Sequence, residues 1–188
     1  MSRGDGRRIG KVAPKGTDEG AMVQSPAVAI LIQHPTLGNI LYDTGNCEDF
    51  SAVYTEEMLH DYPITEMISI QEALAQKGLT PDDIDLIILS HLHFDHAGGL
   101  KHFVGTKAIR RVLVSEADLK NAYWSVMTGN GGAYIRSLFD VEGIQFQTIR
   151  ETTKLAEDLE LFIQASHTPG ARHSGKNCRL PSDCALHA

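Results

Sequence analysis

The sequence predicts a mixed α/β (α+β) fold, because short apolar stretches typical of strands alternate with segments that carry helix-start signals. Residues 85–89 form an apolar run of the length of a buried strand. Residues 27–32 and 40–42 are two further strand-like runs, and the turn-forming segment 34–39 between them predicts a hairpin. A helix is expected to follow over residues 70–77.

Local side chains mark where this helix begins and ends. Ser69 and Glu72 have the spacing of a capping box at its start, and Gly78 is expected to end it in a left-handed conformation. Pro81 then suits the first position of another helical turn. Farther along, Ser115 is expected to cap a helix with apolar residues at helical spacing. The remaining expected elements are strands over residues 111–114, 144–149 and 159–165, and short helical pieces over residues 100–104 and 134–139.

Composition describes an ordinary soluble domain. The 188 residues are 42% hydrophobic and 22% charged, which is typical of a single globular unit. The net charge of −7 gives no reason to expect a nucleic acid or an anionic membrane as partner. No apolar run approaches the roughly 20 residues of a membrane span, and three cysteines do not make a disulfide framework. The expected location is cytoplasmic.

Three segments differ in character along the chain. Residues 1–20 are rich in glycine and charge and are expected to be a disordered leader. Residues 21–170 hold the strand and helix patterns and form the expected domain. Residues 171–188 contain two of the three cysteines and lack strand periodicity, so an atypical tail is expected there.

The most informative motif follows the strand at residues 85–89. His91, His93, Asp95 and His96 offer imidazole and carboxylate groups, which are ligands of zinc and similar divalent ions. Because His91 and His93 are two residues apart in an extended segment, they are expected to clamp one ion, while Asp95 and His96 serve a second ion nearby. Two adjacent ions suit hydrolysis, since both stabilise developing charge.

With this motif the chain resembles the metallo-β-lactamase superfamily. The resemblance implies an αββα sandwich with metals at one edge of two facing sheets. It implies that His91, His93, Asp95 and His96 are metal ligands, and that His167, which precedes Thr-Pro-Gly, completes a three-histidine set. It also implies that Asp43, in Asp-Thr-Gly, holds a ligand in place from behind. The implied cofactor is a divalent metal, with zinc as the expected ion and two ions per site in the family.

Within the superfamily, residues 23–170 look most like the N-acyl homoserine lactonase branch. This implies opening of a lactone ring by a metal-bound hydroxide, with Asp95 also passing a proton to the leaving oxygen. The expected partner is a small lactone or ester, with a homodimer as a further possibility. A thioester or ester hydrolase of the glyoxalase-II type is the alternative enzyme.

The family pattern breaks after Gly170. The aspartate that bridges both metals and the last histidine are not recognisable, which leaves Asp95 and His96 as the only ligands for a second ion. The sandwich is therefore expected to be incomplete at the C-terminus, with an unpaired sheet edge and one or two ions bound. A truncated or frame-slipped form of a longer enzyme would explain the break, and a catalytically impaired metal-binding remnant is the second functional class.

Three other features have simpler interpretations. Cys47 is expected to be a small buried residue and not a nucleophile, because nothing indicates a lowered thiol pKa. His102 lies outside the ligand spacing and is expected at the surface. The aromatic and methionine residues of segment 48–68 either cover part of a substrate pocket or simply pack together.

Overall fold

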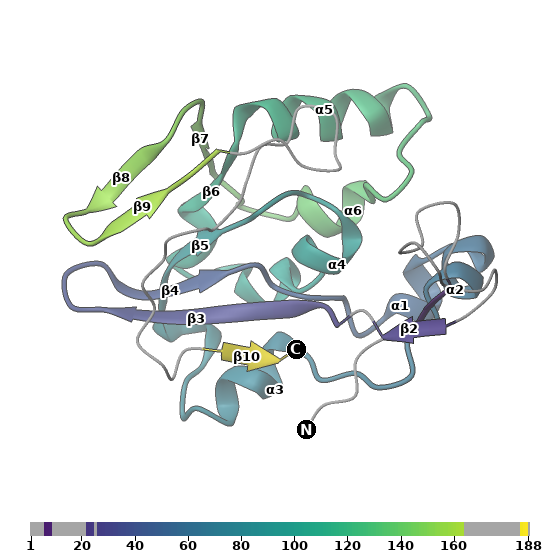
Figure 1. Cartoon of the computed structure of the whole chain (residues 1–188), viewed down its shortest axis with the longest axis horizontal. Helices are drawn as coiled ribbons and strands as arrows, with labels where there is room; N and C mark the ends of the chain where they lie inside the picture. Colours follow the sequence, from purple (N-terminus) through teal and green to yellow (C-terminus); the bar gives the residue numbers. More distant parts are fainter. Residues whose placement is uncertain (1–5, 9–21, 25, 164–184, 188) are drawn as a thin grey trace.

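The computed structural model describes residues 6–8, 22–24, 26–163 and 185–187, and a six-stranded sheet is their central feature (Figure 1). Its strand order is β10-β3-β4-β5-β6-β7. The strands β4, β5, β6 and β7 run parallel to one another, whereas β3 and β10 are antiparallel additions at one side. The bounds are β3 Val28–His34, β4 Gly38–Tyr42, β5 Ile84–Ile88, β6 Val112–Ser115, β7 Phe146–Ile149 and β10 Ala185–His187.

The predicted hairpin is confirmed as β3 and β4. Ile30 pairs with Tyr42 and Ile32 with Ile40, and the chain reverses through a three-residue turn. Gly38 starts the return strand at φ 79°, a left-handed conformation that glycine adopts without a steric penalty. The hairpin places the end of β4 beside the end of β5, since these two strands pair in parallel.

Successive residues of the central strands point to opposite faces of the sheet, and both faces are buried. Leu41 of β4 and Ile87 of β5 belong to a large core with the helices. Ile40 and Ile88 belong to a second core on the other face. That second core includes Leu159, from the separate hairpin formed by β8 (Thr153–Ala156) and β9 (Leu159–Leu161). The α/β class of the prediction is confirmed, with helices on one face and strands on the other.

Short helices cover the first face (Figure 1). The longest is α5, which Ser115 caps as predicted, its side chain accepting a hydrogen bond from the Asp118 amide. The helix α3 starts with the predicted capping box of Ser69 and Glu72, and Gly78 follows it at φ 73°. The helical bounds are α1 Phe50–Val53, α2 Glu56–Asp61, α3 Ile70–Ala75, α4 Phe94–Ala97, α5 Glu116–Met127 and α6 Arg136–Phe139, with 3-10 turns η1 Pro81–Asp83, η2 Leu100–Phe103 and η3 Ala108–Arg110.

Three short strands lie where no strand was expected from the sequence. The strand β1 (Gly6–Arg8), within the expected leader, pairs antiparallel with β2 (Met22–Gln24), just after it. Within the expected tail, β10 pairs antiparallel with Val28–Ile30 of β3, so this edge of the sheet carries a strand where an unpaired edge was expected. β1, β2 and β10 have three residues each, which are too few to produce a readable alternation of apolar and polar residues.

Candidate metal centre

The predicted metal motif lies in the loop that leaves β5 and continues into α4. His91, Asp95 and His96 bring three ligand atoms within 4.8 Å of one another. His91 is buried, whereas Asp95 and His96 are partly exposed, so the cluster lies at the boundary between core and solvent. The side chains of Asp95 and His96 can therefore be reached from solvent.

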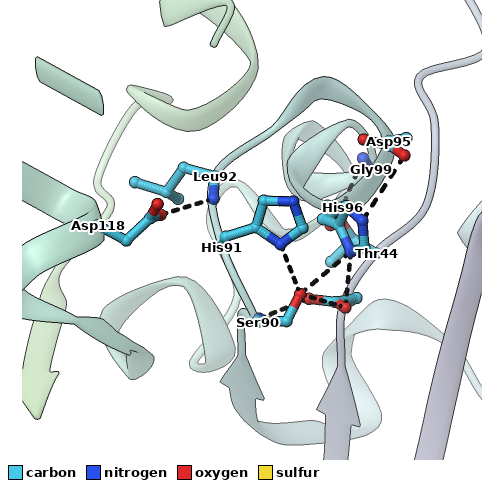
Figure 2. A network of polar contacts seen from close by, with 9 residues as sticks. Thr44, Ser90, His91, Leu92, Asp95, His96, Gly99 and Asp118 are labelled. Atoms are coloured by element: carbon cyan, nitrogen blue, oxygen red, sulfur yellow. Dashed lines mark hydrogen bonds and ion pairs between the residues drawn. The ribbon is translucent and has the colours of Figure 1, made fainter. Parts of the chain in front are cut away.

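The short helix α4 creates the cluster by folding the chain back on itself. The amides of His96 and Ala97 both donate to the carbonyl of His93, at 3.0 and 2.9 Å. This turn brings the ring of His96 to 3.9 Å from that of His91, measured between ring centroids (Figure 2). The side chain of Asp95, in the same turn, has its Oδ2 atom 3.6 Å from Nε2 of His96.

The expected division of the motif between two ions differs from this geometry. His93 lies beside His91, with ring centroids 4.5 Å apart, but it is Asp95 and His96 whose ligand atoms converge with that of His91. The expectation placed His91 and His93 in an extended segment, and Asp95 and His96 in a turn beyond it. That turn is the helix α4, which starts after His93 and brings Asp95 and His96 back toward His91.

Asp43 supports the cluster from behind, as the resemblance implied. Its buried carboxylate accepts hydrogen bonds from the amide and the hydroxyl of Ser90, at 2.7 and 2.8 Å. The same carboxylate lies 2.8 Å from Nδ1 of His96. With Nδ1 held in this way, the Nε2 atom of His96 is left to face Asp95 and the cluster. The hydroxyl of Ser90 also lies 3.0 Å from Nδ1 of His91.

These contacts determine the charge of the site. Burial alone would lower the pKa of His96, but the hydrogen bond and the negative charge of Asp43, together with the charges of Asp95 and Asp118, hold that pKa above its usual value. Three carboxylates, those of Asp43, Asp95 and Asp118, are thus close enough to the His96 imidazole to act on its charge. Such an environment favours a bound cation.

Gly98 and Gly99 allow the motif to pack directly on the loop after β4. A Cβ atom on Gly98 would lie 2.4 Å from the amide nitrogen of Cys47, and one on Gly99 would lie 2.5 Å from the carbonyl oxygen of Thr44. The close approach of the motif to the loop after β4 therefore requires glycine at both positions. Thr44 completes the contact, because its amide and hydroxyl both donate to the carbonyl of His96.

Comparison with known protein families agrees with this geometry. A model of the metallo-beta-lactamase superfamily matches residues 23–180. The chain belongs to this superfamily. The match includes the hairpin, the motif after β5 and all the helices described above.

Several relatives within the superfamily are lactonases. The chain is 28% identical over 187 residues to the N-acyl homoserine lactonase AttM of Rhizobium radiobacter, covering 89% of this chain and 65% of that protein. It is 35% identical over 100 residues to the N-acyl homoserine lactonase AiiB of Agrobacterium fabrum, covering 50% and 36%. The chain thus spans no more than two thirds of the length of either relative.

Solved structures with a similar fold include N-acyl homoserine lactone hydrolases. One is an N-acyl homoserine lactone hydrolase with the product N-hexanoyl-L-homoserine bound at its catalytic metal center. It superposes with a TM-score of 0.70 at 25% identity, covering 90% of this chain and 66% of that one. A quorum-quenching N-acyl homoserine lactone hydrolase superposes with a TM-score of 0.69 at 26% identity, covering 90% and 64%.

Membership of the superfamily implies a divalent metal, and the residues at the site fit one. The cluster combines imidazole nitrogens with a carboxylate oxygen, a donor set suited to zinc and other divalent ions. Nε2 of His91 is buried within it. The carboxylate behind His96 is the kind of partner that orients a metal-binding imidazole.

The other residues considered in the sequence fall outside the cluster. His167 lies outside the described residues, as does the end of the strand predicted to precede it. His102 lies outside the cluster, as expected, and is partly buried, with its Nε2 atom 2.7 Å from the Glu48 carboxylate. Cys47 is buried, and this burial raises the pKa of its thiol, which agrees with packing and not with a nucleophilic role.

Segment 48–68 forms a third apolar cluster around Phe94 of the motif. The rings of Tyr54 and Tyr62 contact the Phe94 ring edge-on, with centroids 4.8 and 5.6 Å away. The Tyr54 hydroxyl donates to Asn46, in the loop after β4. These contacts favour the interpretation of this segment as packing that supports the motif.

In the described part of the chain, none of the helices combines the length and hydropathy needed to cross a membrane.

Proposed function

We propose that this chain carries the metal-binding part of a hydrolase that opens the ring of N-acyl homoserine lactones, with zinc as the ion. The observation that carries the proposal is the convergence of His91, Asp95 and His96, with Asp43 fixed behind them. The lactonase relatives support the substrate class, because they align over the strands and the loop that build this cluster.

Each residue has a role that follows from its contacts. His91 and His96 are proposed as nitrogen ligands, and Asp95 as an oxygen ligand. His93, whose ring lies against that of His91, and His167 are proposed as further ligands on the grounds of the family resemblance alone. When bound, the metal supplies a Lewis acid that polarises the lactone carbonyl and activates water.

Asp95 is also proposed to move a proton. Its side chain is 26% exposed, so it can contact a substrate as well as the cluster. Opening of the lactone breaks the bond between the acyl carbon and the ring oxygen, and that oxygen leaves as an alkoxide that needs a proton. A carboxylate that first takes a proton from the attacking water can deliver that proton to the leaving oxygen.

The test combines metal analysis with turnover of defined substrates. The purified chain is loaded with zinc, its metal content is measured by elemental analysis, and hydrolysis of N-hexanoyl homoserine lactone is compared with that of an acyl thioester. We expect at least one ion per chain and a preference for the lactone. A preference for the thioester would instead favour the glyoxalase-II type of reaction, and metal binding without turnover would indicate an impaired remnant.

Two histidine variants test whether zinc binding and turnover depend on the cluster or on any nearby histidine. His91→Ala is expected to abolish zinc binding and any turnover, since it removes the most buried ligand of the cluster. The matched control is His102→Ala, because His102 is a nearby histidine whose ring nitrogen is bound to Glu48 instead. Equal losses in the two variants would contradict the proposed site.

A further inference from the structure

Asp118 is a fully buried carboxylate outside the metal cluster. It lies in the first turn of α5, where an acidic residue is ordinarily explained by the helix dipole and remains in solvent. Here its exposed fraction is 0%. A buried carboxylate needs specific partners, and those of Asp118 belong to the metal motif and its neighbours.

The first partner is the backbone between two motif histidines. The amide of Leu92 donates to Oδ2 of Asp118 at 2.8 Å (Figure 2). Leu92 separates His91 from His93, so this bond fixes the peptide that links them. The motif has no strand partner at this point, because β5 ends at Ile88.

Every second amide of the motif is held by a different element. Ser90 donates to Asp43, Leu92 donates to Asp118, and Phe94 donates to the carbonyl of Ala133 at 3.0 Å. His91 and His93 each stand between two anchored amides. These three hydrogen bonds therefore fix the backbone of the motif, as pairing with a neighbouring strand would.

The second partner of Asp118 reaches the ring of His93. The hydroxyl of Tyr134 donates to Oδ1 of Asp118 at 2.7 Å, and Asn121 in turn donates to that hydroxyl at 3.1 Å. The Tyr134 ring packs edge-on against the His93 ring, with centroids 4.5 Å apart. Asp118 thus supports His93 twice, through the backbone before it and through the aromatic ring beside it.

We propose that Asp118 is a positioning residue of the metal centre, which fixes the Leu92 amide and, through Tyr134, the orientation of His93. The proposal rests on the proposed function only in requiring that the motif bind a metal. It does not require that lactones be the substrate. Removal of such supporting contacts typically weakens metal binding or activity by about 10–100-fold.

The test measures the zinc affinity of the full chain by competition with a chromophoric chelator. Asp118→Ala is expected to weaken zinc binding by about 10–100-fold, because it removes both anchors. Asp118→Asn keeps a carbonyl oxygen for the Leu92 amide, so it should retain most of the affinity. Tyr134→Phe keeps the ring on His93 but loses the bond to Asp118, and we expect an intermediate loss.

The matched control is Tyr123→Phe. Tyr123 lies on the same helix as Asp118 and also donates its hydroxyl to an aspartate, Asp140, at 2.9 Å. Within the residues that the structure describes, this pair bonds with Arg136 and not with the motif, so its loss should leave zinc affinity unchanged while lowering stability. A second measurement, hydrogen exchange at the Leu92 amide in metal-free protein, should be faster in Asp118→Ala than in the control.

The outcomes separate this inference from the proposed function. Zinc binding without lactone hydrolysis would overturn the lactonase proposal alone. Zinc binding that is unchanged in a folded Asp118→Ala variant would overturn the role of Asp118 alone. If Asp118→Ala fails to fold, Tyr134→Phe decides: wild-type zinc affinity in that variant would overturn the role of Asp118, because the variant lacks the bond through which Asp118 supports His93. An unsubstituted chain that binds no zinc would overturn both.

Discussion

Asp43 combines a backbone conformation and a set of contacts that few residues can provide together. Among the described residues it is the only one other than glycine with a positive φ, at 60°. Asparagine and aspartate tolerate this conformation better than other side chains, which otherwise lose about 1–2 kcal/mol. The conformation turns the carboxylate toward both Ser90 and His96. Aspartate therefore suits this position both for its tolerance of a positive φ and for the two contacts of its carboxylate.

Substitution of Asp43 by asparagine should reduce metal affinity without changing the fold. Asparagine keeps the left-handed backbone, but its amide group can present an N–H to Nδ1 of His96 where a carboxylate now accepts. The proton on the ring would then shift to Nε2, the atom proposed to bind metal. We expect affinity for zinc to fall by about 10–100-fold in a chelator competition assay.

Asp43→Ala provides the comparison. It should lose the metal to a similar extent and also be less stable by about 1–2 kcal/mol in urea, because alanine disfavours the left-handed backbone. Wild-type affinity in the asparagine variant would contradict the orienting role of this carboxylate.

Tyr123 should make stability fall in alkali. Burial, and then its hydrogen bond to Asp140, raise the pKa of Tyr123 to about 12, whereas an unfolded tyrosine ionises near about 10. Between these values the unfolded chain releases a proton that the native chain keeps, so stability declines as pH rises from about 10 to about 12. Urea unfolding across this range should show a smaller decline in Tyr123→Phe, and an identical decline in both proteins would refute the assignment.

At the scale of elements, the features that could be predicted from the sequence are those that depend on local residues. The capping box of α3, the serine cap of α5 and the hairpin of β3 and β4 depend on residues close in the sequence, and all are confirmed. Their hydrogen bonds form within a few residues, so spacing alone reveals them. The four residues proposed as metal ligands were selected in the same way, from their spacing in the sequence.

The residues that contact the motif could not be predicted from local spacing, because they come from distant segments of the chain. Asp118 resembles an ordinary acidic residue in the first turn of a helix, and Tyr134 resembles one more apolar position after a glycine-rich break. Their roles depend on α5 and its following loop packing beside the loop after β5. The grouping of Asp95 and His96 with His91 likewise depends on α4, a helix of four residues that no periodicity reveals.

The cap of α3 can be tested on its own. In the capping box the Ser69 hydroxyl accepts from the Glu72 amide at 3.2 Å, and the Ser69 amide donates to the Glu72 carboxylate at 2.9 Å. Ser69→Ala should lower the free energy of unfolding by about 1 kcal/mol, because the Glu72 amide loses its acceptor. Ser51→Ala, at an exposed serine in α1, should have little effect in the same denaturant titration, and equal effects would argue against the cap.

At the scale of the whole molecule, the metal motif joins parts of the chain that are otherwise separate. The loop after β4 contributes Asp43 and Thr44, the loop after β5 contributes His91, and α5 contributes Asp118. The position of the motif directly after a buried strand could be inferred from the sequence. The contribution of α5 could not, since it follows from how helices pack on the sheet face.

Because these parts meet at one site, a bound metal should stabilise the whole fold. A ligand that binds only the native state adds RT ln(1 + [L]/Kd) to the free energy of unfolding, about 1.4 kcal/mol for each tenfold rise in free metal above Kd. We therefore expect the unfolding midpoint to rise steadily with buffered zinc and to return to its metal-free value with a chelator. His91→Ala should unfold at one midpoint whatever the zinc concentration, whereas His102→Ala should follow the unsubstituted chain. Coincident unfolding curves for the unsubstituted chain in zinc and in chelator would mean that the cluster binds no ion tightly in the native state.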